Sequence, residues 1–77
     1  MIEFKLILKE ESKIYYKFSA VGLNGEFVID SKTSKISFIE VDGFLKDNEK
    51  EKSDLLYIAK KKIIENNFPE SCIYATH

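Results

Sequence analysis

The side chains that could do chemistry in this sequence are few, and their spacing does not favour catalysis. The sole cysteine, Cys72, and the sole histidine, His77, lie five residues apart. In an extended strand, positions separated by an odd number face opposite sides, so these two would not form a nucleophile–base pair. A single cysteine also excludes an internal disulfide and a cysteine-based metal cluster.

The acidic residues provide no better candidate for a catalytic or metal site. Glu10, Glu11 and Asp30 fall in predicted turns, and the carboxylates of residues 49–51 belong to a run of charge. Asp42 precedes a glycine but lacks the further acidic ligands of a calcium site. We therefore predict that the protein is not an enzyme, and we expect no catalytic residue, metal site or cofactor.

Lysine supplies the remaining candidate chemistry. All twelve basic residues are lysine. Arginine is the residue that binds guanine and phosphate through two hydrogen bonds, so its absence argues against sequence-specific nucleic-acid recognition. A weak nucleic-acid-binding protein is the alternative function, with Tyr15 as a stacking platform among basic residues of a sheet. The residues of this alternative are Lys5, Lys17, Lys60, Lys61 and Lys62.

Length and composition indicate a single small domain over residues 1–77. The net charge is −1 and 44% of the residues are hydrophobic, so the chain can form a core and has no overall field that selects polyanions. No stretch approaches the ~20 apolar residues of a membrane span. The first residues are interrupted by charges where a signal peptide would be apolar. We expect a cytoplasmic protein without membrane contact.

Several segments alternate apolar and polar residues with the period of half-buried strands. The first two are residues 2–9 and 13–21, joined by a polar turn that places Leu8 opposite Ile14, both on the apolar side of the predicted sheet. The segment that follows Gly25 and residues 36–41 continue the pattern. The apolar, inner face of the predicted sheet carries Phe4, Leu6, Tyr16, Phe18, Phe27, Ile29 and Phe38.

Asn24–Gly25 is the strongest turn signal in the chain, because this dipeptide suits the two central positions of a type I′ turn. A turn there pairs Leu23 with Glu26 and Ala20 with Ile29. The hydrophobic alternation of the flanking segments supports the same register.

A second polar turn, residues 30–35, leads into the last strand of the meander. If Asp30 pairs with Lys35, then Ile36 and Phe38 face inward, whereas Ile39 and Val41 face outward. Residues 27–41, FVIDSKTSKISFIEV, are similar in pattern to the strand–Asp–turn–strand hairpin of PepSY-type domains. This resemblance covers 15 of the 77 residues, and no function is carried over from it.

Residues 54–68, DLLYIAKKKIIENNF, show the only long helical period, with an apolar stripe of Leu55, Leu56, Ala59 and Ile63. Two helix starts fit the sequence. Ser53 can be the N-cap, which we favour, or Asn48 can cap an earlier turn with Glu51 as its capping-box partner.

Pro69 ends the predicted helix, and residues 72–75 are predicted to form a short fifth strand. That strand fits antiparallel at the edge beside the first strand, which we prefer, or parallel beside the fourth. The predicted fold is α+β, in the order β-β-β-β-α-β: a four-stranded antiparallel meander, one helix packed on one face, and a short C-terminal strand.

The opposite, outer face of the sheet is where a partner would bind. Ile7 opposite Tyr15 forms one predicted apolar island, and Val21 opposite Val28, with Ile39 diagonal to Val28, forms another. Exposed apolar clusters and unpaired strand edges are typical of interaction sites. We therefore predict a small non-catalytic interaction or inhibitory accessory module, of a bacterial or phage type, that binds a protein partner through the outer face or an edge strand. Homodimerisation is a further expectation, because an exposed edge invites it.

Overall fold

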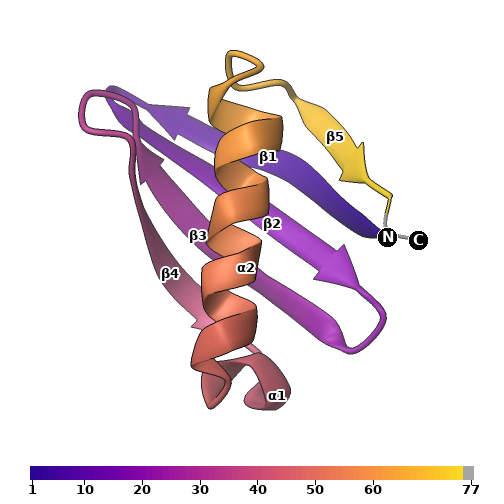
Figure 1. The fold of residues 1–77 in the computed structure, drawn as a ribbon. Coiled ribbons are helices and arrows are strands. Elements are labelled where there is room, and N and C mark those ends of the chain that lie inside the picture. Colours follow the sequence, from indigo (N-terminus) through magenta and orange to yellow (C-terminus); the bar gives the residue numbers. More distant parts are fainter. Residues whose placement is uncertain (76–77) are drawn as a thin grey trace.

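Residues 1–75 fold into a five-stranded antiparallel sheet with a helix across one of its faces (Figure 1). This computed structural model describes these residues and all of their side chains except that of Phe44. The strand order is β4-β3-β2-β1-β5, which confirms both the predicted fold class and the preferred place of the last strand beside the first. The elements are β1 (Ile2–Glu10), β2 (Lys13–Ala20), β3 (Leu23–Asp30), β4 (Lys35–Val41), α1 (Gly43–Lys46), α2 (Glu49–Ala59), η1 (Lys60–Ile64) and β5 (Ser71–Tyr74).

The first hairpin contains a β-bulge that the sequence pattern does not reveal. Leu6 pairs with Tyr16 as predicted, but Leu8 pairs with Tyr15 because Ile7 is an extra residue in β1. A one-residue shift sends the later side chains to the other face. Leu8, predicted to lie inside, is therefore 48% exposed on the outer face. Two consecutive apolar residues hide the shift, since either one could continue the alternation.

The turn between β2 and β3 lies at Val21–Gly22, so the predicted turn at Asn24–Gly25 is wrong. Gly22 has a φ of 76°, a value that glycine adopts readily. Gly25 instead lies inside β3. A Cβ there would meet the backbone oxygen of Glu40 and come within 2.7 Å of Cζ of Phe18. Gly25 is therefore needed for close packing, and this tertiary requirement overrides the local turn signal.

The corrected register nevertheless preserves the predicted core. Ile29 pairs with Ile14 in place of the predicted Ala20, a change of six positions along β2. Because six is an even number, each side chain keeps its face. Ile29 and Phe27 are fully buried as predicted. The predicted pairing of Val21 with Val28, however, is wrong.

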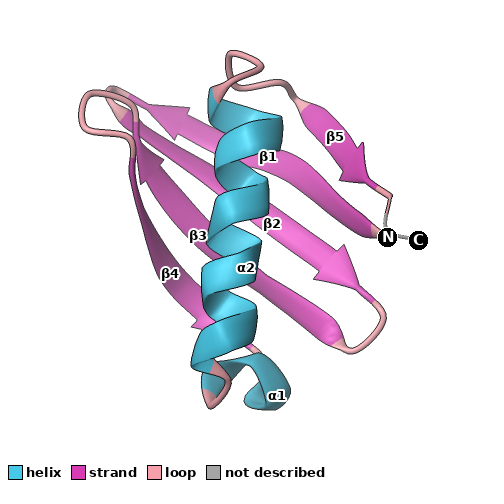
Figure 2. Cartoon of the chain, in the orientation of Figure 1, coloured by secondary structure: helices cyan, strands magenta, loops and turns pink. Residues whose placement is uncertain are grey.

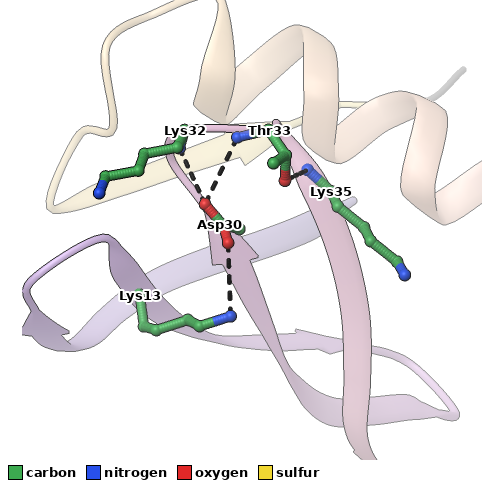
Figure 3. Close-up of polar contacts among 5 residues, drawn as sticks. All are labelled: Lys13, Asp30, Lys32, Thr33 and Lys35. Atoms are coloured by element: carbon green, nitrogen blue, oxygen red, sulfur yellow. Dashed lines mark hydrogen bonds and ion pairs between the residues drawn. The ribbon is translucent and has the colours of Figure 1, made fainter.

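Asp30 organises the turn between β3 and β4 (Figure 3). Its Oδ1 accepts hydrogen bonds from the backbone nitrogens of Lys32 at 2.9 Å and Thr33 at 3.4 Å. Its Oδ2 lies 3.4 Å from Nζ of Lys13 on β2. Ser34 has a φ of 62°, the left-handed conformation for which a turn glycine would be the usual choice. The turn is thus held by side-chain bonds to its own backbone.

A second β-bulge interrupts β4. The predicted register holds from Lys35 to Phe38, where Ile39 is an extra residue. Beyond it Val41, predicted to point outward, lies opposite Gly25 and packs against the inner core. The physical reason is the same as in β1: an inserted residue reverses the faces that follow.

The main helix begins at Glu49, which confirms the earlier of the two predicted starts and not the favoured start near Ser53. Oδ1 of Asn48 accepts a hydrogen bond from the backbone nitrogen of Glu51 at 3.1 Å. Glu49 and Glu51 in the first turn also suit the positive end of the helix dipole. This first turn is polar, so the apolar periodicity of the sequence does not reveal it.

The short helix α1 was not predicted from the sequence. Asp42 is its N-cap: Oδ1 accepts a hydrogen bond from the backbone nitrogen of Leu45 at 3.1 Å. Its Oδ2 accepts another from the backbone nitrogen of Asn24 at 2.7 Å. Leu45 is fully buried, so the charged connection between β4 and α2 is anchored to the core at its start.

A π-helical turn, η1, ends the helix, with the backbone nitrogen of Glu65 bonded to the carbonyl of Lys60 at 3.1 Å. A π turn contains more residues than an α turn. Leu55, Ala59 and Ile63 recur at intervals of four, which exceeds the 3.6 of an α-helix, and the wider turn helps to keep all three on the sheet. All three are buried as predicted. The fourth stripe residue, Leu56, is only half-buried.

Aromatic side chains form the centre of the inner face. The ring of Phe27 lies 6.0 Å from that of Phe4 and 5.7 Å from that of Phe18, measured between centroids. The hydroxyl of Tyr16 donates a hydrogen bond of 2.5 Å to the carbonyl oxygen of Pro69. This bond ties the centre of the sheet to the segment that leads from the helix into β5.

Candidate interaction surface

The outer face of the sheet is uncovered by the rest of the described chain, because the helical segments pack on the inner face (Figure 2). Cross-strand pairing arranges its side chains in three rows that run from β1 to β4. The first charged row is Glu10, Lys13, Asp30 and Lys35. The apolar row is Leu8, Tyr15, Val28 and Ser37. The second charged row is Lys5, Lys17, Glu26 and Glu40.

The apolar row brings together most of the predicted partner-binding residues. Tyr15 pairs with Leu8 on one side and with Val28 on the other. The bulge residues Ile7 and Ile39 lie between this row and the second charged row, and they are 50% and 52% exposed. The two predicted islands are therefore a single band.

Two corrections concern the members of this band. Val21 does not belong to it, because it is fully exposed in the β2–β3 turn. Leu8 does belong and was missed. The only signal that could have found it is the break in alternation at Ile7–Leu8, since two adjacent apolar residues in a half-buried strand are compatible with a bulge.

The second charged row is positive on β1 and β2 and negative on β3 and β4. Lys5 pairs directly with Lys17, and Glu26 pairs directly with Glu40. Like charges that lie directly opposite each other destabilise a sheet. In the first charged row the signs alternate, and Lys13 is in salt-bridge range of the Asp30 carboxylate, at 3.4 Å.

The lysines of the nucleic-acid alternative lie on two different layers. Lys5 and Lys17 are on the outer face of the sheet, whereas residues 60–62 are in η1 on the inner side. Nζ of Lys61 is 3.6 Å from a carboxylate oxygen of Glu65, which offsets part of its charge. The sheet separates the two groups, so they do not form one basic patch.

An open groove of about 590 Å³ lies on the helix side of the molecule, between α2 and the ends of β1 and β2. Val21, Ile58 and the exposed ring of Tyr57 contribute to its apolar lining, and the carboxylates of Glu51 and Asp54 also line it. Tyr57, which lies outside the apolar stripe of the helix, is thus placed at the groove. Its carboxylates would favour a positively charged ligand.

Burial raises the pKa of two groups on the inner face. The pKa of Tyr16 is raised to about 12, chiefly because burial disfavours the charged phenolate, and the nearby Cys72 adds to the effect. The pKa of Cys72 is itself raised by burial, with an opposing effect of Lys62. A raised pKa keeps Cys72 as the thiol, which is the poor nucleophile. His77, with which no pairing was predicted, lies outside the described residues.

The pKa of Asp30 is lowered, chiefly by the hydrogen bond from the backbone nitrogen of Lys32. Bonds of this kind stabilise the carboxylate, so Asp30 keeps its negative charge on the outer face at neutral pH.

Within residues 1–75, no group of three or more His, Cys, Asp or Glu side chains is arranged to hold a metal ion. In the same residues, no helix is long and apolar enough to cross a membrane. Comparison with protein-family models, curated proteins and solved structures found no match to this chain.

Proposed function

We propose that this protein is a small non-catalytic interaction module that binds a protein partner through the outer face of its sheet. The observation that carries the proposal is the apolar row on an uncovered face, bordered on both sides by charged rows. An apolar centre with a charged rim is the usual anatomy of a protein–protein interface. Tyr15, placed between Leu8 and Val28, provides the kind of aromatic anchor that dominates binding energy.

The edge strands support partner binding less well than the face does. The bulge at Ile39 interrupts the ladder of β4, and bulges protect sheet edges from strand addition. The other edge strand, β5, is only four residues long. We therefore assign the partner to the face, where it would act as an accessory or inhibitory contact by covering a surface. The nucleic-acid alternative stays a prediction, and the neighbouring glutamates Glu26 and Glu40 on the same face do not favour it.

Site-specific cross-linking in the cells that produce the protein tests this proposal. A photoreactive amino acid at Ser37, the exposed end of the apolar row, should cross-link to protein. The same group at Lys60, exposed on the helix side, is the matched control and should cross-link far less. Adding Tyr15→Ala should reduce cross-linking from Ser37 at least several-fold, because it removes the anchor. Tyr57→Ala, an equal loss of an exposed ring on the other layer, should leave it unchanged.

Equal cross-linking from the two positions would contradict the proposal. So would undiminished cross-linking from Ser37 after Tyr15→Ala in a chain that remains folded by circular dichroism.

A further inference from the structure

We infer that the protein partner of the outer face is a second copy of this chain, related by a two-fold axis parallel to the strands and midway between β2 and β3. This inference rests on the proposed function, because it uses the same face. Such an axis lays β2 of one copy over β3 of the other, and β1 over β4. A two-fold dimer requires a surface that is complementary to itself, and the rows of the outer face meet this requirement.

The charges on the two central strands select this axis. The outward charges of β2 are Lys13 and Lys17, and those of β3 are Glu26 and Asp30. Placing β2 over β3 sets Lys17 against Glu26 of the second copy and Lys13 against Asp30. A two-fold axis perpendicular to the strands would instead place β2 over itself, lysine against lysine.

The outer strands follow the same rule. The axis sets Lys5 on β1 against Glu40 on β4 of the second copy, and Glu10 against Lys35. The like-charged neighbours Lys5–Lys17 and Glu26–Glu40, which are unfavourable within one chain, each meet a pair of opposite charge. Among the described outward charges of β1 to β4, Glu3 is unmatched. It lies at one end of the face, where two twisted sheets diverge.

Most of the apolar residues obey the same symmetry, whereas Leu8 on β1 lies over Ser37 on β4 of the second copy. Tyr15 on β2 lies over Val28 on β3 of the second copy. The bulge residues Ile7 and Ile39 both lie between the apolar row and the second charged row, Ile7 next to Leu8 and Ile39 next to Glu40. The axis therefore brings them near each other, with an offset of about one residue, or roughly 3.3 Å, along the strands. Both bulges thus become part of a single two-fold pattern, in which an apolar band is enclosed by matched charges.

The size of the face indicates a weak dimer. Four strands about 4.8 Å apart are roughly 19 Å wide, and about eight residues at roughly 3.3 Å each extend about 26 Å. The flat footprint of about 500 Å² per copy is smaller than the ~800 Å² of a standard interface. We therefore expect a dimer with a Kd in the micromolar range, which forms and separates with concentration.

Paired charge reversals test the geometry in solution. Lys5→Glu with Lys17→Glu makes the second charged row wholly acidic, and Glu26→Lys with Glu40→Lys makes it wholly basic. In sedimentation velocity over about 5–500 µM, the unmodified protein should dimerise, and each reversed protein should be monomeric. An equimolar mixture of the two should form a heterodimer. The matched control for the acidic protein, Lys46→Glu with Lys60→Glu, makes the same charge change away from the face and should dimerise normally.

A folded pair of reversed proteins that does not associate on mixing would overturn the inference, as would an unmodified protein that is monomeric throughout. If circular dichroism shows that either reversed protein does not fold, the dependence of the Kd of the unmodified protein on salt tests the charge pairing instead. Raising NaCl to about 1 M shortens the screening length to ~3 Å and should raise the Kd at least tenfold, so a salt-independent dimer would refute the charge pairing. A monomeric protein that still cross-links to another protein through Ser37 would refute the dimer alone, whereas loss of cross-linking as well would refute the proposed function.

Discussion

Replacing Gly25 by alanine should destabilise this protein more than replacing Gly22 by alanine. The two glycines have different tasks. Gly22 occupies the β2–β3 turn with a φ of 76°, and a Cβ added there would have no atom within 4 Å. Gly25 lies in β3, where an added Cβ would meet the backbone oxygen of Glu40 and approach Cζ of Phe18 to 2.7 Å and Cε1 to 3.0 Å.

The magnitudes follow from these surroundings. At Gly22 only the left-handed backbone is penalised, which costs about 1–2 kcal/mol. At Gly25 the neighbours must move, and neither moves easily: Phe18 is fully buried and stacked on Phe27, and the atom of Glu40 belongs to the backbone. Overpacking of this kind costs about 1–3 kcal/mol and occasionally more. We expect the upper end, about 3 kcal/mol, which is a large part of the stability of a small domain.

Urea denaturation followed by circular dichroism measures both changes. With a slope of about 1 kcal/mol per molar urea for a small protein, the midpoint should fall by roughly 3 M for Gly25→Ala and by roughly 1–2 M for Gly22→Ala. A turn at Asn24–Gly25 would reverse the order, because Gly25 would then carry the left-handed backbone and Gly22 would lie in a strand. A smaller loss for Gly25→Ala than for Gly22→Ala would therefore refute the register on which the rows of the outer face depend.

Two further predictions concern hydrogen bonds between side chains and the backbone. Tyr16→Phe should lower the free energy of unfolding by about 1–2 kcal/mol in urea titrations, because the carbonyl of Pro69 loses its partner. Raising the pH from about 10 towards 12 should destabilise the unmodified protein but scarcely affect Tyr16→Phe. The reason is that unfolded tyrosine ionises near pH 10, whereas folded Tyr16 has a pKa of about 12. An equal loss of stability in the two proteins would contradict this. Asp42→Ala should cost about 1–2 kcal/mol in thermal melts, because Leu45 and Asn24 each lose an acceptor, whereas Asp47→Ala should change little.

The hydrophobic alternation was sufficient to predict the core even where the register was wrong. Ile14, Phe27 and Ile29 are buried as expected, although the partner of Ile29 moved from Ala20 to Ile14. The alternation reports only whether a residue points in or out, so any even shift of register leaves the prediction intact. The same property explains why the candidate surface was predicted in its members more accurately than in its arrangement.

The bulges could not be predicted from the sequence, and they decide the arrangement of the surface. Ile7 and Ile39 each sit in a run of apolar residues where two registers satisfy the alternation equally well. The choice depends on how β1 and β4 curve with the rest of the sheet, which is a property of the whole fold. As a result, Leu8 joined the outer face and Val41 left it.

The sequence by itself determined the fold class, the inner face of the sheet and the scarcity of catalytic groups, and it favoured the sheet edge beside β1 as the place of β5. These follow from periodicity, turn composition and residue types, which are local. Only the tertiary structure decided which glycine turns the chain, where the strands bulge, and how charges from four strands line up in rows. Those features depend on contacts between residues that are far apart in the sequence. The close approach of Gly25 to Phe18 and Glu40 is an example, and no local sequence pattern predicts it.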